Sequence, residues 1–77
     1  MKFGKALENL EAGQKVARGG WNGGTYVVLV PACDGIQPDG TPAHYGMYLQ
    51  YCDKNGNLVP YMPTYAEIFA GNWTVVS

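Results

Sequence analysis

Few side chains in this 77-residue sequence are of types that could perform catalysis. Nucleophilic catalysis needs a Ser, Thr or Cys that is activated by an oriented base. The sequence offers one histidine, His44, and two cysteines, Cys33 and Cys52. We interpret these as a surface histidine and two small buried apolar side chains with free thiols. A zinc site needs about four close ligands, so the sequence predicts no metal, no cofactor and no catalytic residue.

Some carboxylates and glycines could bind a ligand, but their sequence patterns are only weakly specific. Asp34, Asp39 and Asp53 lie in predicted turns, where Asp caps its own backbone. Glu67 has aromatic neighbours, and it either closes a capping box with Thr64 or contacts a ligand. Four glycines in segment 19–24 do not match a phosphate-binding loop. Their backbone N–H groups could still form an anion nest.

Aromatic side chains are the most informative feature, because a core this small holds only a few such rings. We predict that Trp73 is part of the core. Trp21 lies between pairs of glycines and should be exposed unless another surface covers it. Tyr and Trp are enriched at binding surfaces, and stacking of one base is worth ~1–3 kcal/mol. The pattern therefore predicts a small nucleotide-like ligand. The tyrosines are Tyr26, Tyr45, Tyr48, Tyr51, Tyr61 and Tyr65. The aromatic candidates for ligand contact are Trp21, Tyr26, Tyr61 and Tyr65.

Composition excludes several partners. The net charge of −1 provides no basic surface for DNA. No apolar run approaches the ~20 residues of a membrane span, and no secretory signal is evident, so we expect a cytoplasmic protein. Only 14% of residues are charged, against roughly 25% in an average soluble domain. A single domain over residues 1–77 has a core worth at most ~3–5 kcal/mol, which favours association with other subunits.

The predicted elements make an α+β fold. An apolar stripe at Phe3, Ala6, Leu7 and Leu10 predicts a helix over 2–12 that ends at Gly13. Segment 32–44 is expected to be a loop or a loose hairpin. A short C-terminal helix should follow Thr64. Together these elements indicate a small, strongly bent antiparallel sheet with an N-terminal helix and a short C-terminal helix. The expected strands are 15–18, 25–30, 46–52, 58–61 and 73–76.

Two segments resemble a known family. The run at 16–23, preceded by the run at 3–7 and Gly13, resembles the N-terminal signature of a small phage and prophage family, and residues 59–73 resemble its C-terminal motif. This family is the second type of Thoeris anti-defence protein, formerly a domain of unknown function. The family usually has Trp at Tyr61, Asp at Glu67 and an acidic pair at Gly71 and Asn72.

The resemblance implies a non-enzymatic phage sponge. Such proteins bind and sequester the cyclic ADP-ribose signal of bacterial TIR enzymes without degrading it, and thereby block Thoeris defence. Some relatives also capture cyclic oligonucleotides. The expected assembly is a homotetramer, a dimer of dimers with ligand pockets between subunits, in the host cytoplasm.

On this hypothesis the predicted site residues have distinct roles, except Tyr26, which is a candidate for ligand contact without an assigned role. Trp21 and either Tyr61 or Tyr65 would sandwich a base. Other groups would read the base or ribose edges, namely Asn22, Thr64 and Glu67. Phosphate would be held by Arg18 and the N–H groups of Gly23 and Gly24.

Two other functions stay open. The aromatic surface could be an interaction module that inhibits a host factor. Alternatively, the chain could be a nucleotide-processing enzyme with His44 as its base.

Overall fold

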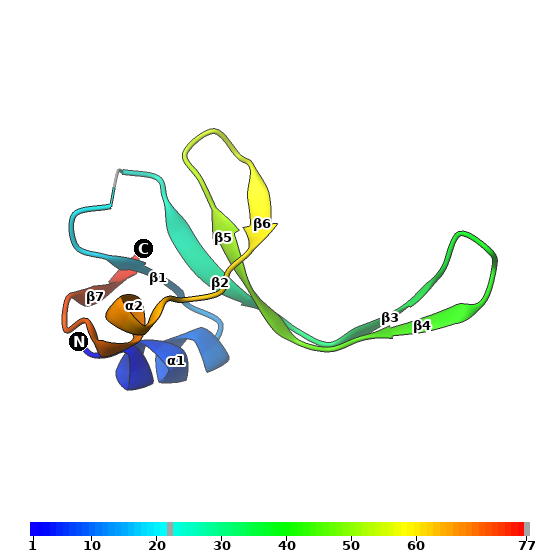
Figure 1. Cartoon of the computed structure of the whole chain (residues 1–77), viewed down its shortest axis with the longest axis horizontal. Helices are drawn as coiled ribbons and strands as arrows, with labels where there is room; N and C mark the ends of the chain where they lie inside the picture. The colour runs from blue at the N-terminus through cyan, green and yellow to red at the C-terminus, as the bar shows by residue number, and fades with distance from the viewer. Residues whose placement is uncertain (22, 77) are drawn as a thin grey trace.

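The computed structural model describes residues 1–21 and 23–76 and has the predicted α+β fold (Figure 1). An N-terminal helix and a short C-terminal helix accompany antiparallel strands, which confirms the predicted fold class. The elements in chain order are α1 (Phe3–Glu11), β1 (Lys15–Arg18), β2 (Tyr26–Val30), β3 (Cys33–Ile36), β4 (Pro42–Tyr45), β5 (Tyr48–Cys52), β6 (Leu58–Pro60), α2 (Tyr65–Phe69) and β7 (Trp73–Val76).

The main sheet brings the two ends of the chain together. Its strand order is β6-β5-β2-β1-β7, and each neighbouring pair is antiparallel. The last strand, β7, therefore lies beside the first strand, β1, with Arg18 opposite Trp73. The N-terminal amino group of Met1 donates to the carbonyl oxygens of Gly71 and Trp73 at 3.1 and 2.8 Å. This pairing places residues 18–21 next to Asn72 and Trp73.

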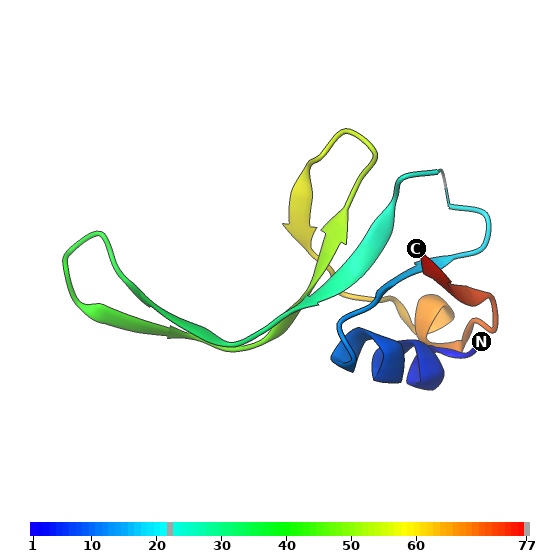
Figure 2. The ribbon, with the colours of Figure 1, turned by 180° about the vertical axis from the view of Figure 1, so that it is seen from behind.

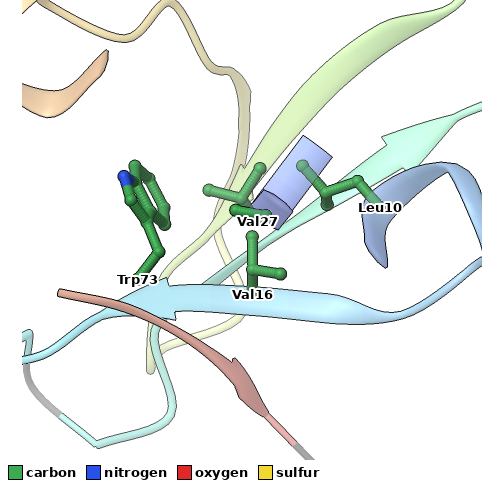
Figure 3. Packing of buried hydrophobic residues seen from close by; sticks show 5 residues of the cluster. Leu10, Val16, Val27 and Trp73 are labelled. Carbon is green, nitrogen blue, oxygen red and sulfur yellow. The ribbon is translucent and has the colours of Figure 1, made fainter. Parts of the chain in front are cut away.

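The core lies on the face of the sheet that α1 covers. Ala6 and Leu10 of α1 are fully buried against side chains of β1, β2 and β7 (Figure 3). The helical spacing predicted from the sequence accounts for this stripe, and α1 ends before Gly13, whose φ of +88° suits glycine. Trp73 is 1% exposed, which confirms its predicted place in the core. The core cluster is Ala6, Leu10, Val16, Val27 and Trp73.

Segment 32–44 is a regular hairpin and not a loop. β3 and β4 form a separate two-stranded sheet, which extends away from the rest of the molecule (Figures 1 and 2). Its register continues that of β2 and β5, since Val30 lies opposite Tyr48 and Cys33 opposite Tyr45. The turn at its tip is closed by a hydrogen bond from Gln37 N–H to the carbonyl oxygen of Thr41 at 2.8 Å. We call residues 31–47 the arm.

Candidate ligand-binding site

A cluster of aromatic rings lies beside the core. Trp21, at the turn after β1, is half-buried against three rings that come from β5, β7 and the segment after β6. Its ring centroid is 5.5 Å from those of Tyr51 and Trp73 and 6.1 Å from that of Tyr61. Rings from distant segments of the same chain therefore cover part of the indole, which the sequence analysis expected to be exposed unless another surface covers it. We call Trp21, Tyr51, Tyr61 and Trp73 the aromatic cluster.

Within one chain, Trp21 and Tyr61 do not form the two sides of a base sandwich, so a sandwich with a ring of another copy or with Tyr65 stays a prediction. A sandwich needs two nearly parallel rings, whereas Trp21 and Tyr61 meet edge to face at an interplanar angle of 75°. Within one chain these two rings therefore leave no slot for a base between them. Tyr65, the other predicted partner, lies on α2 and is 80% exposed.

Arg18 is held at the edge of the aromatic cluster by Asn72. Its Nε donates to Asn72 Oδ1 at 3.0 Å, and Asn72 Nδ2 donates in turn to the carbonyl oxygen of Gly19 at 3.0 Å. The Gly19 N–H donates to the Asn72 carbonyl oxygen at 2.7 Å. Within residues 1–21 and 23–76, no carboxylate forms an ion pair with Arg18. The terminal guanidinium nitrogens are therefore oriented without being neutralised.

Glu67 closes the predicted capping box at the start of α2. Its backbone N–H donates to Thr64 Oγ1 at 3.3 Å, while the Thr64 N–H donates to Glu67 Oε1 at 3.0 Å. The indole Nε1 of Trp73 donates to the Glu67 carbonyl oxygen at 2.9 Å, which ties α2 to the core. The capping alternative for Glu67 is thus confirmed. A ligand contact through the same carboxylate stays a prediction.

Tyr61, Glu67 and Arg18 influence each other electrostatically. Burial, and then the Glu67 carboxylate, raise the pKa of Tyr61 far above its ordinary value. Burial alone would raise the pKa of Glu67, but hydrogen bonds from Thr64, the nearby Tyr61 hydroxyl and the Arg18 charge lower it overall. The Tyr61 hydroxyl oxygen is buried and has no hydrogen bond of good geometry within the described part of the chain. Glu67 is therefore a carboxylate at neutral pH, and Tyr61 is a neutral phenol.

The other predicted site residues lie apart from this group. Tyr26 lies on the opposite face of the sheet, where Lys15 Nζ is 4.6 Å from its ring centroid and Cys52 raises its pKa through a hydrogen bond. Gly24, with φ +88°, lies against the turn after β5, since a Cβ there would be 3.3 Å from Lys54 Cβ. Gly23 is exposed. Asn22 lies outside the described residues.

Two members of the group were missed by the sequence analysis. Tyr51 alternates with Gln50 along β5 and so faces the core side, a pattern that the sequence already contained. Asn72 precedes the core residue Trp73, but its role depends on β7 pairing with β1, which no local pattern indicates.

The candidate catalytic residues do not come together. His44 is exposed and pairs with Asp34, with 2.7 Å between Nδ1 and Oδ1. Both cysteines are free thiols, as predicted, and Cys52 is buried. Cys33 is exposed on β3, so its predicted burial is wrong. No three His, Cys, Asp or Glu among the described residues lie close enough to hold a metal ion.

A single chain does not enclose a ligand. The part of the chain that the structure describes contains no pocket. Any small molecule that contacts the aromatic cluster of one isolated chain therefore stays partly open to water.

No helix among the described residues is long and apolar enough to cross a membrane.

Comparison with known proteins assigns the family. The family model of the Tad2-like proteins, the Thoeris anti-defense 2-like domain, matches residues 1–76. The chain belongs to the Tad2-like family. It is also similar to Thoeris anti-defense 2 of Bacillus phage SP01, with 29% identity over 87 aligned positions that cover 100% of this chain and 96% of that relative. Membership of the Tad2-like family supports a role in anti-defence against Thoeris.

Proposed function

We propose that this Tad2-like protein is a sponge that binds a cyclic ADP-ribose-type signal and holds it unchanged in the host cytoplasm. One observation supports this most directly: a cation and a carboxylate both lie near the hydroxyl of one ring of the aromatic cluster. Arg18 and Glu67 are close enough to the Tyr61 hydroxyl to shift its pKa in opposite directions. A nucleotide needs a flat surface for its base, an acceptor for ribose hydroxyls and a cation for phosphate.

Arg18 is the proposed phosphate contact. Because Asn72 occupies its Nε–H, the donors on its terminal nitrogens keep a fixed direction. Hydrogen bonds between a guanidinium and a phosphate are charge-assisted and short. The N–H groups of Gly23 and Gly24, in the same loop as Trp21, would add neutral donors.

Glu67 and its neighbours are the proposed ribose and base contacts. Oε1 of Glu67 accepts from the N–H and hydroxyl of Thr64, whereas Oε2 accepts no hydrogen bond within the described residues. Oε2 is therefore free to accept a ribose hydroxyl. Asn22 and the Thr64 hydroxyl would read the remaining polar edges. The base would stack on the outer face of Trp21 and on Tyr65.

The proposal includes association of copies. A sponge that lowers a signal below its receptor's threshold needs roughly nanomolar affinity, about −12 kcal/mol. Small-molecule sites of this kind bury most of the ligand surface, and residues 1–21 and 23–76 of one chain form no pocket that could do so. We therefore place the ligand between copies in a homotetramer that is a dimer of dimers. Tyr26, on the opposite face of the sheet, contacts the ligand only if that face also meets another copy.

Thermal unfolding with added ligand tests the binding. A ligand that binds only the folded protein stabilises it by about 2.7 kcal/mol at one hundred times its dissociation constant. We expect cyclic ADP-ribose isomers to raise Tm by several degrees, and linear ADP-ribose to have a smaller effect. An unchanged Tm with every cyclic ADP-ribose isomer would contradict the proposal.

A second candidate function, an interaction module that inhibits a host protein, is favoured by an exposed apolar surface. Met62, Tyr65 and Phe69 are 87%, 80% and 80% exposed in the single chain. Exposed apolar patches commonly mark protein interfaces. Sizing of the purified protein separates the two functions: a homo-oligomer supports the sponge, and a monomer that captures a host protein supports the module.

A further inference from the structure

Asn72 holds the side chain of Arg18 and the start of the Trp21 loop at the same time. Its Oδ1 accepts from Arg18 Nε at 3.0 Å, and its Nδ2 donates to the Gly19 carbonyl oxygen at 3.0 Å. Its backbone carbonyl oxygen accepts from the Gly19 N–H at 2.7 Å. The loop then turns, and the Trp21 N–H donates to the Arg18 carbonyl oxygen at 3.2 Å. One residue from the far end of the chain therefore fixes both the cation and the backbone that leads to the indole.

The two partners of the Asn72 side chain require an amide. The Arg18 Nε–H is a donor and needs an oxygen, whereas the Gly19 carbonyl is an acceptor and needs an N–H. An ionised aspartate in this place would have two oxygens and no donor. One oxygen would face the Gly19 carbonyl oxygen, and the carboxylate would place a negative charge beside the guanidinium. The amide satisfies both partners and stays neutral.

Arg18 keeps its charge and most of its donors beyond this contact. A guanidinium has several N–H donors in a planar fork, and within residues 1–21 and 23–76 the Arg18 side chain donates only to Asn72. Neither of the ion pairs in that part of the chain involves Arg18. Its outer donors are therefore available to an anion, while the contact at Nε restricts the directions in which they point.

We propose that Asn72 is a positioning residue for anion binding, which aims the Arg18 guanidinium at a phosphate group and, because it is neutral, leaves that cation its charge. The inference rests on the proposed function, in which Arg18 contacts the phosphate, and it names the negative charge of the ligand as the property that this part of the site recognises. A diphosphate offers several charged acceptor oxygens to the fork of the guanidinium. A nucleoside without phosphate would lose this contact.

Two substitutions of Asn72 separate its two effects. Asn72→Asp keeps an acceptor for Arg18 Nε but adds a carboxylate that pairs with the guanidinium. Asn72→Ala removes the acceptor and leaves the charge of Arg18 uncompensated. Gln37→Glu is the matched control, because it also exchanges an amide for a carboxylate, at an exposed position in the turn at the tip of the arm. Circular dichroism checks that each variant is folded.

Calorimetric titration with a cyclic ADP-ribose isomer measures the effect on affinity. We expect Asn72→Asp to weaken binding at least tenfold and Gln37→Glu to leave it within twofold. Added salt should weaken binding to the natural protein more steeply than binding to Asn72→Asp, because salt screens the charge that the natural protein presents to the ligand. Asn72→Ala should weaken binding at least threefold and keep the salt dependence of the natural protein. Equal affinities of the natural protein and Asn72→Asp, or equal losses from Asn72→Asp and Gln37→Glu, overturn the proposal.

Nuclear magnetic resonance follows Arg18 without relying on a nucleotide. Arg18 is the only arginine in the sequence, so its Nε–H signal is assigned without ambiguity. A hydrogen-bonded N–H exchanges with water more slowly than a free one. We expect exchange at least tenfold slower in the natural protein than in Asn72→Ala. Inorganic pyrophosphate should shift the signal in the natural protein and leave it in place in Asn72→Asp. Equal exchange rates, or equal pyrophosphate shifts, overturn the proposal.

The two sets of measurements distinguish this inference from the sponge itself. Slow exchange together with a pyrophosphate shift, but without binding of any cyclic ADP-ribose isomer, refutes the sponge and supports the role of Asn72. Nucleotide binding that both Asn72→Asp and Asn72→Ala leave unchanged supports the sponge and refutes the role of Asn72.

Discussion

Three groups favour the charged form of Glu67, and burial opposes it. Burial raises the pKa of the carboxyl, but the hydrogen bonds from Thr64, the nearby Tyr61 hydroxyl and the charge of Arg18 together lower it. A pKa that is lowered by folding means that the folded protein binds the proton less tightly than the unfolded chain does. The ionised carboxylate therefore stabilises the fold above the unfolded pKa, and the contribution is lost as the pH falls below it.

This linkage predicts a pH-dependent effect of Glu67→Gln. The variant should unfold at a lower temperature than the natural protein at pH 7, because the amide loses the charge-assisted part of the capping box. The difference in Tm should shrink as the pH falls below about 4.5, where the unfolded carboxylate is protonated. Thermal unfolding between pH 3 and 7 measures it, and a difference that grows towards low pH would refute the assignment.

The buried hydroxyl of Tyr61 is predicted to add little to stability. It has no hydrogen bond of good geometry within the described residues, and burying an unsatisfied polar group costs about 1–3 kcal/mol. Tyr61→Phe should therefore leave the free energy of unfolding unchanged or raise it. Denaturant unfolding checks this, and a loss of more than about 1 kcal/mol would show that the hydroxyl has a partner.

Arg18 is predicted to contribute ligand affinity through its charge. A hydrogen bond to a charged group is worth about 1.5–3 kcal/mol, so Arg18→Ala should weaken binding of a cyclic ADP-ribose isomer roughly 10- to 150-fold. Calorimetric titration measures the change. Lys5→Ala is the matched control, since Lys5 also carries one positive charge but lies on α1, paired with Glu8. Equal losses from the two variants would point to net charge rather than to a contact.

At the scale of elements, α2 depends on its cap. The helix has five residues and no buried side chain, so the capping box and the bond from Trp73 Nε1 hold it in place. Thr64→Ala should cost about 1 kcal/mol of stability, and Thr64→Ser, which keeps the hydroxyl, close to none. Denaturant unfolding compares them. Identical stabilities of the two variants would mean that the cap does not hold α2.

An element could be predicted from the sequence where the residues that stabilise it lie close together in the chain. The stripe of α1 and the Thr64–Glu67 box were predictable, because all the residues involved lie within a few positions of each other. The burial of Trp21 was not, because its contacts come from Tyr51, Tyr61 and Trp73. The glycines around Trp21 indicated an irregular loop correctly, but they say nothing about which rings approach it.

The distance along the chain also explains the other differences between the sequence prediction and the structure. The pairing of β7 with β1 joins residues as distant as Thr74 and Ala17, which are 57 positions apart, and it alone brings Asn72 to Arg18. The turn residues in segment 32–44 allowed either a loop or a hairpin. The hairpin forms because the register of β2 and β5 continues through it.

At the scale of the whole molecule, the core is small, so we expect association between copies to contribute to the stability of the fold. The fully buried cluster is built around Leu10, Val16, Val27 and Trp73, while large apolar side chains on α2 and the arm stay exposed in the single chain. Anything that binds the folded state alone raises Tm with concentration. We therefore expect Tm to rise with protein concentration, as measured by calorimetry across a hundredfold dilution, and a constant Tm would contradict association of the folded chains.

The central claim is that the protein captures a signalling nucleotide without altering it. The most direct test is to express the protein together with an active TIR enzyme, purify it, release bound small molecules by heat and identify them by mass spectrometry. The account predicts an intact cyclic ADP-ribose isomer in stoichiometric amount, and a strongly reduced amount from Arg18→Ala. Recovery of no nucleotide, or only of a hydrolysed product, would contradict it.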